Sequence, residues 1–129
     1  MHHMRRFPTL FSQAVIALKL QRVFPGVIDR YMGKDLDVEK EQDVDSVRGS
    51  YFAINHTALE KIGMLDERYF IWMEEVDYCR QAKQKRMRVR YVPSIVAHDL
   101  VGKSFSQRNK WWKRKQFSKS MATYFLKWL

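Results

Sequence analysis

Cysteine is almost absent from this sequence, since Cys79 is the single thiol in 129 residues. A lone cysteine excludes an internal disulfide and a cysteine-rich zinc site, and it suits a reducing cytoplasm. The sequence also lacks a glycine-rich phosphate loop and has too few strand–helix alternations for a complete nucleotide-binding sheet. We find no internal repeat.

Long apolar runs are missing as well. No stretch reaches the roughly 18 consecutive apolar residues that a membrane-spanning helix requires. The opening MHHMRRFPTL is basic but has no apolar core before a small-residue cleavage site, so it does not read as a secretory signal. We therefore expect a cytoplasmic chain, at most peripheral on the inner face of the membrane.

Acidic residues are few and unevenly distributed along the sequence. The chain has 24 Lys and Arg against 14 Asp and Glu, for a formal charge of +10. Acids crowd residues 35–45, whereas from Leu100 onward there are none. A basic excess of this size favours anionic partners such as nucleic acid, a phospholipid surface or a phosphate-bearing substrate.

What the chain does have is apolar and aromatic mass. At 46% hydrophobic and 14% aromatic residues, it can bury one core but hardly two. We expect one domain, or one part of a larger domain. Its pattern divides into an amphipathic helix (1–26), an acidic loop (27–46), a central segment (47–104) and a basic, aromatic helical tail (105–129).

The first helix is predicted to open near Pro8 and to stop at Pro25-Gly26. Its apolar residues recur at helical spacing, namely Leu10, Phe11, Ala14, Val15 and Leu18. Two interpretations remain open. The stripe packs on the core, or it lies in a membrane interface with the basic residues toward headgroups.

The central segment alternates between strand and helix patterns. VRGSYFAIN predicts a strand that ends at Asn55. Thr57 and Glu60 fit a capping box for a short helix that stops at Gly63. EEVDYCRQAKQKR predicts a helix with acids in its first turn and bases in its last. MRVRYVPSIVAHD predicts a further strand, with Pro93 at an edge or a bulge.

The tail from Phe117 is predicted to be an amphipathic helix, with Phe117, Met121, Tyr124, Phe125 and Trp128 on one stripe. Lys110 and Lys113 would fall on the same stripe, so we expect a bend near residue 115.

Between residues 47 and 104 the order of short motifs is specific. The residues that carry it are Val47, Gly49, Gly63, Asp66-Glu67, Phe70, Glu74-Glu75-Val76-Asp77, Cys79, Arg80, Tyr91-Val92-Pro93, His98, Gly102 and Ser104. In this order and spacing they resemble the second half of family 2 glycosyltransferases of the rhamnosyltransferase-like kind, which share the GT-A fold. RRFPTL and FSKSMATYF also resemble flanking segments of these enzymes, so the resemblance covers nearly the whole chain.

The resemblance implies an α/β fold, here a partial GT-A fold of a few strands flanked by helices. It implies inverting transfer of a sugar from a nucleotide-sugar donor to a carbohydrate or lipid-linked acceptor, in the synthesis of cell-surface polysaccharide. In such a reaction a carboxylate takes the proton of the attacking hydroxyl, and the resemblance gives that role to Glu75. Glu74 and Asp77 would then orient neighbours or hold the start of the helix. Taken alone, however, three acids in a first turn are also what the helix macrodipole favours.

The same resemblance implies a set of substrate-binding residues: Gly49, Asp66, Trp72, Arg80, His98 and Ser104. His98 is also the candidate metal ligand. All of these residues except Ser104 also have a structural role as an alternative to substrate binding. Trp72, like Tyr69, stacks on a sugar or packs in the core, and His98 can simply end a strand. Asp66 caps a turn, Gly49 permits one, and Arg80 pairs with a helix carboxylate or a phosphate.

Two residues depart from the family pattern, since Glu75 stands where Asp is usual and Trp72 where Tyr or Phe is usual. The donor-binding half and its Asp-x-Asp metal motif are missing. DLD at 35–37 lies in a polar loop and reads as a coincidence. We therefore expect this chain to lack transferase activity alone, with the donor half on missing sequence or on a separate polypeptide, and Mg²⁺ or Mn²⁺ bound in the complete enzyme.

A second hypothesis of another class is a non-catalytic basic module. KWWKRKQFSKS interleaves aromatic and cationic side chains, which suits an anionic membrane surface or single-stranded nucleic acid. We favour the membrane, because a lipid-linked acceptor agrees with the resemblance; nucleic acid is the less favoured partner.

Overall fold

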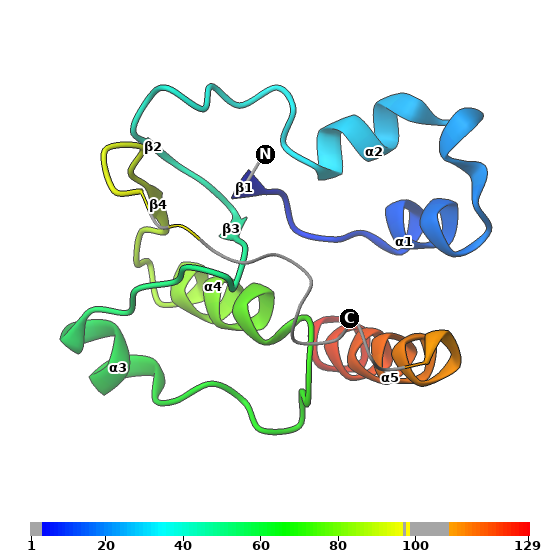
Figure 1. Ribbon diagram of the computed structural model, residues 1–129. Coiled ribbons are helices and arrows are strands. Elements are labelled where there is room, and N and C mark those ends of the chain that lie inside the picture. Colours follow the sequence, from blue (N-terminus) through cyan, green and yellow to red (C-terminus); the bar gives the residue numbers. More distant parts are fainter. Residues whose placement is uncertain (1–3, 97, 99–108) are drawn as a thin grey trace.

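The computed structural model describes residues 4–96, 98 and 109–129 (Figure 1). Its elements in chain order are β1 (Met4–Arg5), α1 (Leu10–Ala17), the 3-10 turn η1 (Leu20–Arg22), α2 (Pro25–Tyr31), β2 (Gln42–Asp43), β3 (Ser46–Val47), α3 (His56–Ile62), α4 (Glu74–Gln84), β4 (Arg90–Tyr91) and α5 (Lys110–Trp128). In Figure 1, α4 occupies the middle, with α1 and α2 above it and α5 below.

The strands form two short antiparallel ladders within the described residues. β1 pairs with β3, with Met4 opposite Val47, and β2 pairs with β4, with Gln42 opposite Tyr91. The longer strands predicted over 47–55 and 87–99 are therefore wrong in length over the described part. A strand extends only as far as a neighbour supplies hydrogen bonds, and each ladder spans two residues per strand. The partial GT-A fold stays a prediction.

The first helix departs from its predicted course. Thr9, not Pro8, is the N-cap, and its side chain accepts a hydrogen bond from the backbone N–H of Ser12. The helix ends at Ala17, and a left-handed Lys19 leads into η1. Pro25-Gly26 does not stop a helix but opens α2, because the fixed φ of proline suits a first helical position. The segment predicted as an acidic loop, 27–46, thus begins within α2.

The short helix α3 ends as predicted but starts earlier. Gly63 follows its last residue with φ 91°, a conformation that favours glycine. Its N-cap is Asn55 rather than Thr57, because the Asn55 side chain accepts a hydrogen bond of 2.7 Å from the backbone N–H of Ala58. Asn55 therefore starts a helix and does not end a strand.

The helix α4 is confirmed, with Glu74, Glu75 and Asp77 in its first turn and Lys83 in its last. The tail helix is also confirmed, but the bend near residue 115 is wrong, because α5 runs unbroken from an N-cap at Asn109. Lys110 lies exposed in the first turn, beyond the buried cluster, so its charge does not conflict with the apolar stripe.

The main hydrophobic core lies between α4 and α5. Tyr69, Met73, Val76 and Tyr124 form its buried centre. Around them pack the partly buried rings of Phe7, Phe117, Phe125 and Trp128, with the side chain of Met121. The predicted tail stripe is thus the face that α5 buries.

A buried carboxylate joins the two helices. Asp77 is 1% exposed, and its oxygens accept hydrogen bonds from Lys127 Nζ at 2.7 Å and Trp128 Nε1 at 2.6 Å. Gln81 Nε2 adds a third at 2.8 Å and the Tyr69 hydroxyl a fourth at 3.3 Å. Desolvation of the charge is offset only by this complete set of donors.

We predict that Asp77→Ala lowers the free energy of unfolding by about 3–5 kcal/mol, because it leaves the Lys127 ammonium half-buried without its nearest carboxylate. Urea titration followed by circular dichroism measures the change. Asp29→Asn is the control, since Asp29 pairs with Lys34 in an exposed position, and it is expected to shift stability by less than about 1 kcal/mol. Equal effects of the two substitutions would contradict this reading.

Candidate functional site

The helix α4 presents its functional side chains on two different faces. Glu75 and Cys79, one turn apart, face β3 and the segment just after it: the backbone at Val47 hydrogen-bonds the Cys79 thiol, and Gly49 lies against Glu75. Asp77 and Arg80 face α5 instead. The acidic motif therefore serves two places, and only its Glu75 side belongs to the candidate site.

The Glu75 carboxyl is half-buried, and its Oε2 is buried with no hydrogen-bond donor among the described residues. Burial raises its pKa, and repulsion from Glu74 adds to the rise. Its own backbone N–H, that of Gly49 and the positive charge of Arg48 act in the opposite direction. A carboxylate that is short of donors and harder to ionise is a stronger proton acceptor than an exposed one.

Gly49 lets the backbone approach this carboxyl. A Cβ at position 49 would lie 3.5 Å from Glu75 Cδ and 3.6 Å from Oε1. These are ordinary contact distances, so an alanine fits and a larger side chain would press on the carboxylate. Gly49 thus lies against Glu75, and its role in substrate binding stays a prediction.

Glu74 is the second carboxylate at this helix start. Burial raises its pKa too, and its Oε2 is likewise buried without a donor in the described part of the chain. Two adjacent under-solvated acids are more than the macrodipole explains, since acids placed for that reason alone lie in solvent.

Polar groups from the N-terminal elements complete the surroundings of Glu75. Tyr31 of α2 is close enough for Glu75 to raise its phenol pKa, although burial is the larger cause. Gln13 of α1 hydrogen-bonds the same phenol, and Arg5 of β1 acts on it electrostatically. The pKa of Arg5 is lowered chiefly by burial and also by the positive charge of Arg48. Sequence reasoning missed this cluster, because Gln13 and Tyr31 carry no local motif.

The backbone just before α4 is strained. Trp72 and Met73 have φ of 62° and 72°, a left-handed conformation that costs a non-glycine residue about 1–2 kcal/mol. Met73 is also buried in the core. Such strain persists where surrounding contacts fix it and is common next to functional groups. Here it sets the direction in which Glu74 and Glu75 leave the loop.

The aromatic residues before α4 pack largely against α5. The Trp72 ring meets Phe117 edge-on at 5.8 Å between centroids, and Phe70 meets Trp112 at the same separation. Ser120 Oγ donates to the Ile71 carbonyl at 2.7 Å. The structure therefore gives Trp72 a packing contact, while stacking of a sugar on it stays a prediction.

Arg80 and Asp66 also have structural partners. The Arg80 guanidinium lies over the rings of Phe7, Tyr124 and Trp128 and donates to the Tyr124 hydroxyl at 2.9 Å. It pairs with no helix carboxylate in these contacts. Asp66 caps its turn, accepting from the backbone N–H of Arg68. The hydrogen bonds from the Arg68 side chain hold the pKa of Asp66 far below its usual range.

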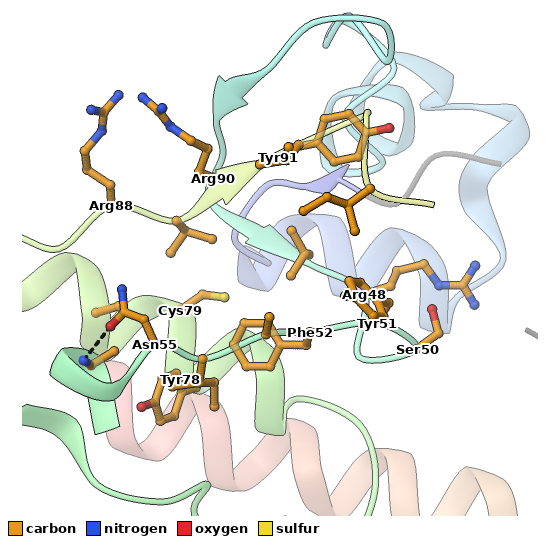
Figure 2. Close-up of a pocket in the computed structure, with 18 of the residues that line it drawn as sticks. Arg48, Ser50, Tyr51, Phe52, Asn55, Tyr78, Cys79, Arg88, Arg90 and Tyr91 are labelled. Carbon is orange, nitrogen blue, oxygen red and sulfur yellow. Dashed lines mark hydrogen bonds between the residues drawn. The ribbon is translucent and has the colours of Figure 1, made fainter. Parts of the chain in front are cut away.

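A cavity of about 570 Å³ lies beside Arg48 and Ser50 (Figure 2). Phe52, Tyr78 and Cys79 form part of its wall, and Figure 2 shows Arg48 and Ser50 at one end, with Arg88 and Arg90 at the other. Its volume suits a small molecule. Glu75 does not line this cavity, but Gly49, which contacts Glu75, stands between two residues that do.

His98 lines the same cavity and is exposed. The described residues contain no group of three His, Cys, Asp or Glu side chains able to hold a metal ion, so they give His98 no companion ligands. Ser104 lies outside the described residues. Among the described residues, no helix is both long and apolar enough to span a bilayer.

One comparison relates the chain to a protein of stated function. Over 64 residues it is 28% identical to a low-salt glycan biosynthesis hexosyltransferase of Haloferax volcanii. The match covers 50% of this chain and 20% of the relative, so the chain spans a small part of that enzyme's length. No family model matches the chain, and no solved structure matches it. The similarity suggests a glycosyltransferase role and does not specify substrate or mechanism.

We predict that Glu75→Gln stabilises the fold above neutral pH, on the order of 1 kcal/mol, because it removes a desolvated charge. A carboxyl whose folded pKa is raised stabilises the fold at low pH, and this stability is lost as pH rises from the ordinary value through the raised one. Chemical denaturation at pH 5 and pH 8 measures the effect. The variant should lose less stability between the two, whereas Glu67→Gln, at an exposed position, should behave like the unsubstituted chain.

Proposed function

We propose that this chain is the acceptor-side portion of an inverting family 2 glycosyltransferase with a GT-A fold. The observation that supports it best is the Glu75 carboxyl, held half-buried at the start of α4, with one oxygen that receives no hydrogen bond from the described residues. The ordered motifs over 47–104 and the partial similarity to a hexosyltransferase support the same reaction class. The chain would act in the cytoplasm on a nucleotide-sugar donor and a carbohydrate or lipid-linked acceptor.

In the proposed reaction, the acceptor hydroxyl oxygen attacks the anomeric carbon of the donor sugar from the side opposite the diphosphate. The new C–O bond forms as the bond from carbon to the diphosphate oxygen breaks, and its electron pair leaves with the nucleoside diphosphate. Glu75 takes the hydroxyl proton. Its pKa, raised chiefly by burial, strengthens it as a base.

Arg48 acts electrostatically on Glu75, and Arg5 acts on the neighbouring phenol of Tyr31. Preorganised cations stabilise the charge that develops on a leaving diphosphate, and we assign them that role. Tyr31 would fix the acceptor through its phenol. We also propose Mg²⁺ or Mn²⁺ for the complete enzyme, with His98 as a candidate ligand and further ligands beyond the described residues.

The rival function is a non-catalytic basic module, favoured by the exposed cationic side chains of α5, among them Lys110, Arg114, Lys115 and Lys119. It predicts that Glu74 and Glu75 can be replaced without any loss of function. The proposed transferase requires Glu75, so replacing this one residue distinguishes the two functions.

We predict that Glu75→Gln lowers kcat by at least about a thousandfold, because the hydroxyl proton then has no acceptor, while nucleotide-sugar binding stays within about twofold. The assay needs the donor-binding half, either on the same polypeptide or added in trans. Glu67→Gln is the matched control and should keep full activity. Retained turnover in Glu75→Gln would remove Glu75 from the role of base.

We further predict that kcat/KM falls on the acid side with a midpoint above about 4.5, the ordinary value for a glutamate side chain. Only the ionised form accepts a proton, and burial has raised the pKa at which it forms. Arg48→Gln removes one cause that lowers this pKa and should move the midpoint upward. A pH–rate profile of both proteins checks the direction, and a midpoint that does not move would contradict the assignment.

A further inference from the structure

The helix α1 is turned the opposite way from an ordinary surface helix. Its polar residues Ser12 and Gln13 are buried, at 3% and 5% exposure. Leu10, Phe11 and Leu18, which the sequence pattern places on one stripe with the buried Val15, are 55%, 56% and 67% exposed. The stripe was expected either to pack on the core or to lie in a membrane interface. In the structure most of it faces outward.

The exposed apolar side chains continue past the end of α1. Val23 and Phe24 are exposed as well, and the Phe24 ring contacts Phe11 edge-on at 5.7 Å. We call Leu10, Phe11, Leu18, Val23 and Phe24 the outer apolar face. Single exposed apolar residues are common, but five within the short segment 10–24, two of them in ring contact, indicate an interaction surface.

The charged residues within the segment 10–24 are both positive. They are Lys19 and Arg22, and both are exposed. The segment itself contains no acidic residue. Aliphatic side chains that alternate with cations and lack acids complement an anionic lipid surface, in which the chains enter the acyl boundary and the cations meet headgroups.

We propose that residues 10–24 dock on an anionic phospholipid bilayer, with the outer apolar face inserted at the interface and Lys19 and Arg22 toward the headgroups. Nucleic acid is the weaker fit, because it would leave Leu10, Leu18 and Val23 without an apolar contact. Single-strand binders rely on aromatic stacking, and Phe11 and Phe24 contact each other.

The second acid-free helix lies on the same side of the molecule. In Figure 1, α5 runs below α1 at the right of the view. Phe7, just before α1, belongs to the cluster that packs on Phe125 and Trp128 of α5.

The orientation of α1 also connects the surface to the interior. Its outward side chains would lie in the interface, while Gln13, on its inward face, hydrogen-bonds Tyr31 beside Glu75. A single helix therefore separates the bilayer from the polar cluster. The membrane proposal stands without the transferase, because it depends on the outer apolar face and its charges alone.

Flotation with vesicles tests the proposal. The chain should bind phosphatidylcholine vesicles that contain about one third phosphatidylglycerol, and bind pure phosphatidylcholine at least tenfold more weakly. Phe11→Ser combined with Leu18→Ser should weaken binding at least tenfold, as should Lys19→Gln combined with Arg22→Gln. Met64→Ser is the matched control, since Met64 is an apolar side chain 78% exposed in another region, and it should bind as the unsubstituted chain does.

Labelling at position 18 gives a readout that does not depend on affinity. Cys79 is fully buried and burial raises its pKa to about 12, so an environment-sensitive thiol dye goes to the introduced cysteine of Leu18→Cys. Its emission should shift to the blue and rise with anionic vesicles, while the same dye on Met64→Cys should not change. No shift at position 18, or vesicle binding that survives both double substitutions, would overturn the proposal. So would tighter binding to a single-stranded oligonucleotide that the same substitutions abolish.

Discussion

The charge of Asp77 is the constraint on which the rest of the structure depends. A carboxylate at 1% exposure is tolerated only with a full set of donors, and two of them, Lys127 and Trp128, come from the far end of α5. This requirement fixes α5 along α4 and sets which way α4 is rotated. Glu75, two residues away, is then directed toward Gly49. The geometry of the candidate site therefore depends on the hydrogen bonds of Asp77, a residue outside it.

Asp77 and Glu75 show opposite solutions for an acid in the same helical turn. Asp77 is saturated with donors and is structural. Glu75 is kept short of them, so burial raises its pKa. The fold would be more stable if Glu75, like Asp77, had a full set of hydrogen-bond donors. Proteins that retain an under-solvated carboxylate usually do so at a site where the chemistry requires it. The strained Trp72–Met73 backbone before α4 fits the same pattern, since contacts with α5 hold it in place.

Local signals predicted the elements that local physics determines. The acids and bases of residues 74–84 indicated α4, Gly63 indicated the end of α3, and the apolar spacing from Phe117 indicated the buried face of α5. Prediction failed where a distant partner decides. The strands around 47 and 90 are as short as their ladders. The stripe of α1 was correctly found, but a pattern does not say whether it faces protein or surroundings. Of the candidate site, the motif order predicted Glu75 and Gly49, which lie against each other, while their roles stay a prediction. It did not predict Gln13, Tyr31 and Arg5, because only folding brings their three separate elements together around the Tyr31 phenol.

The position of Lys127 and Trp128 has a consequence for the order in which the molecule is made. A ribosome releases α4 well before it releases these two residues, and during that interval Asp77 has only Gln81 and Tyr69 as donors. The nascent helix α4 can form, but its rotation about its own axis is not yet fixed relative to its neighbours. The acidic turn therefore reaches its final position only after residues 127 and 128 have been made, and a stall before codon 127 would leave a chain whose helices are present but not yet registered to each other.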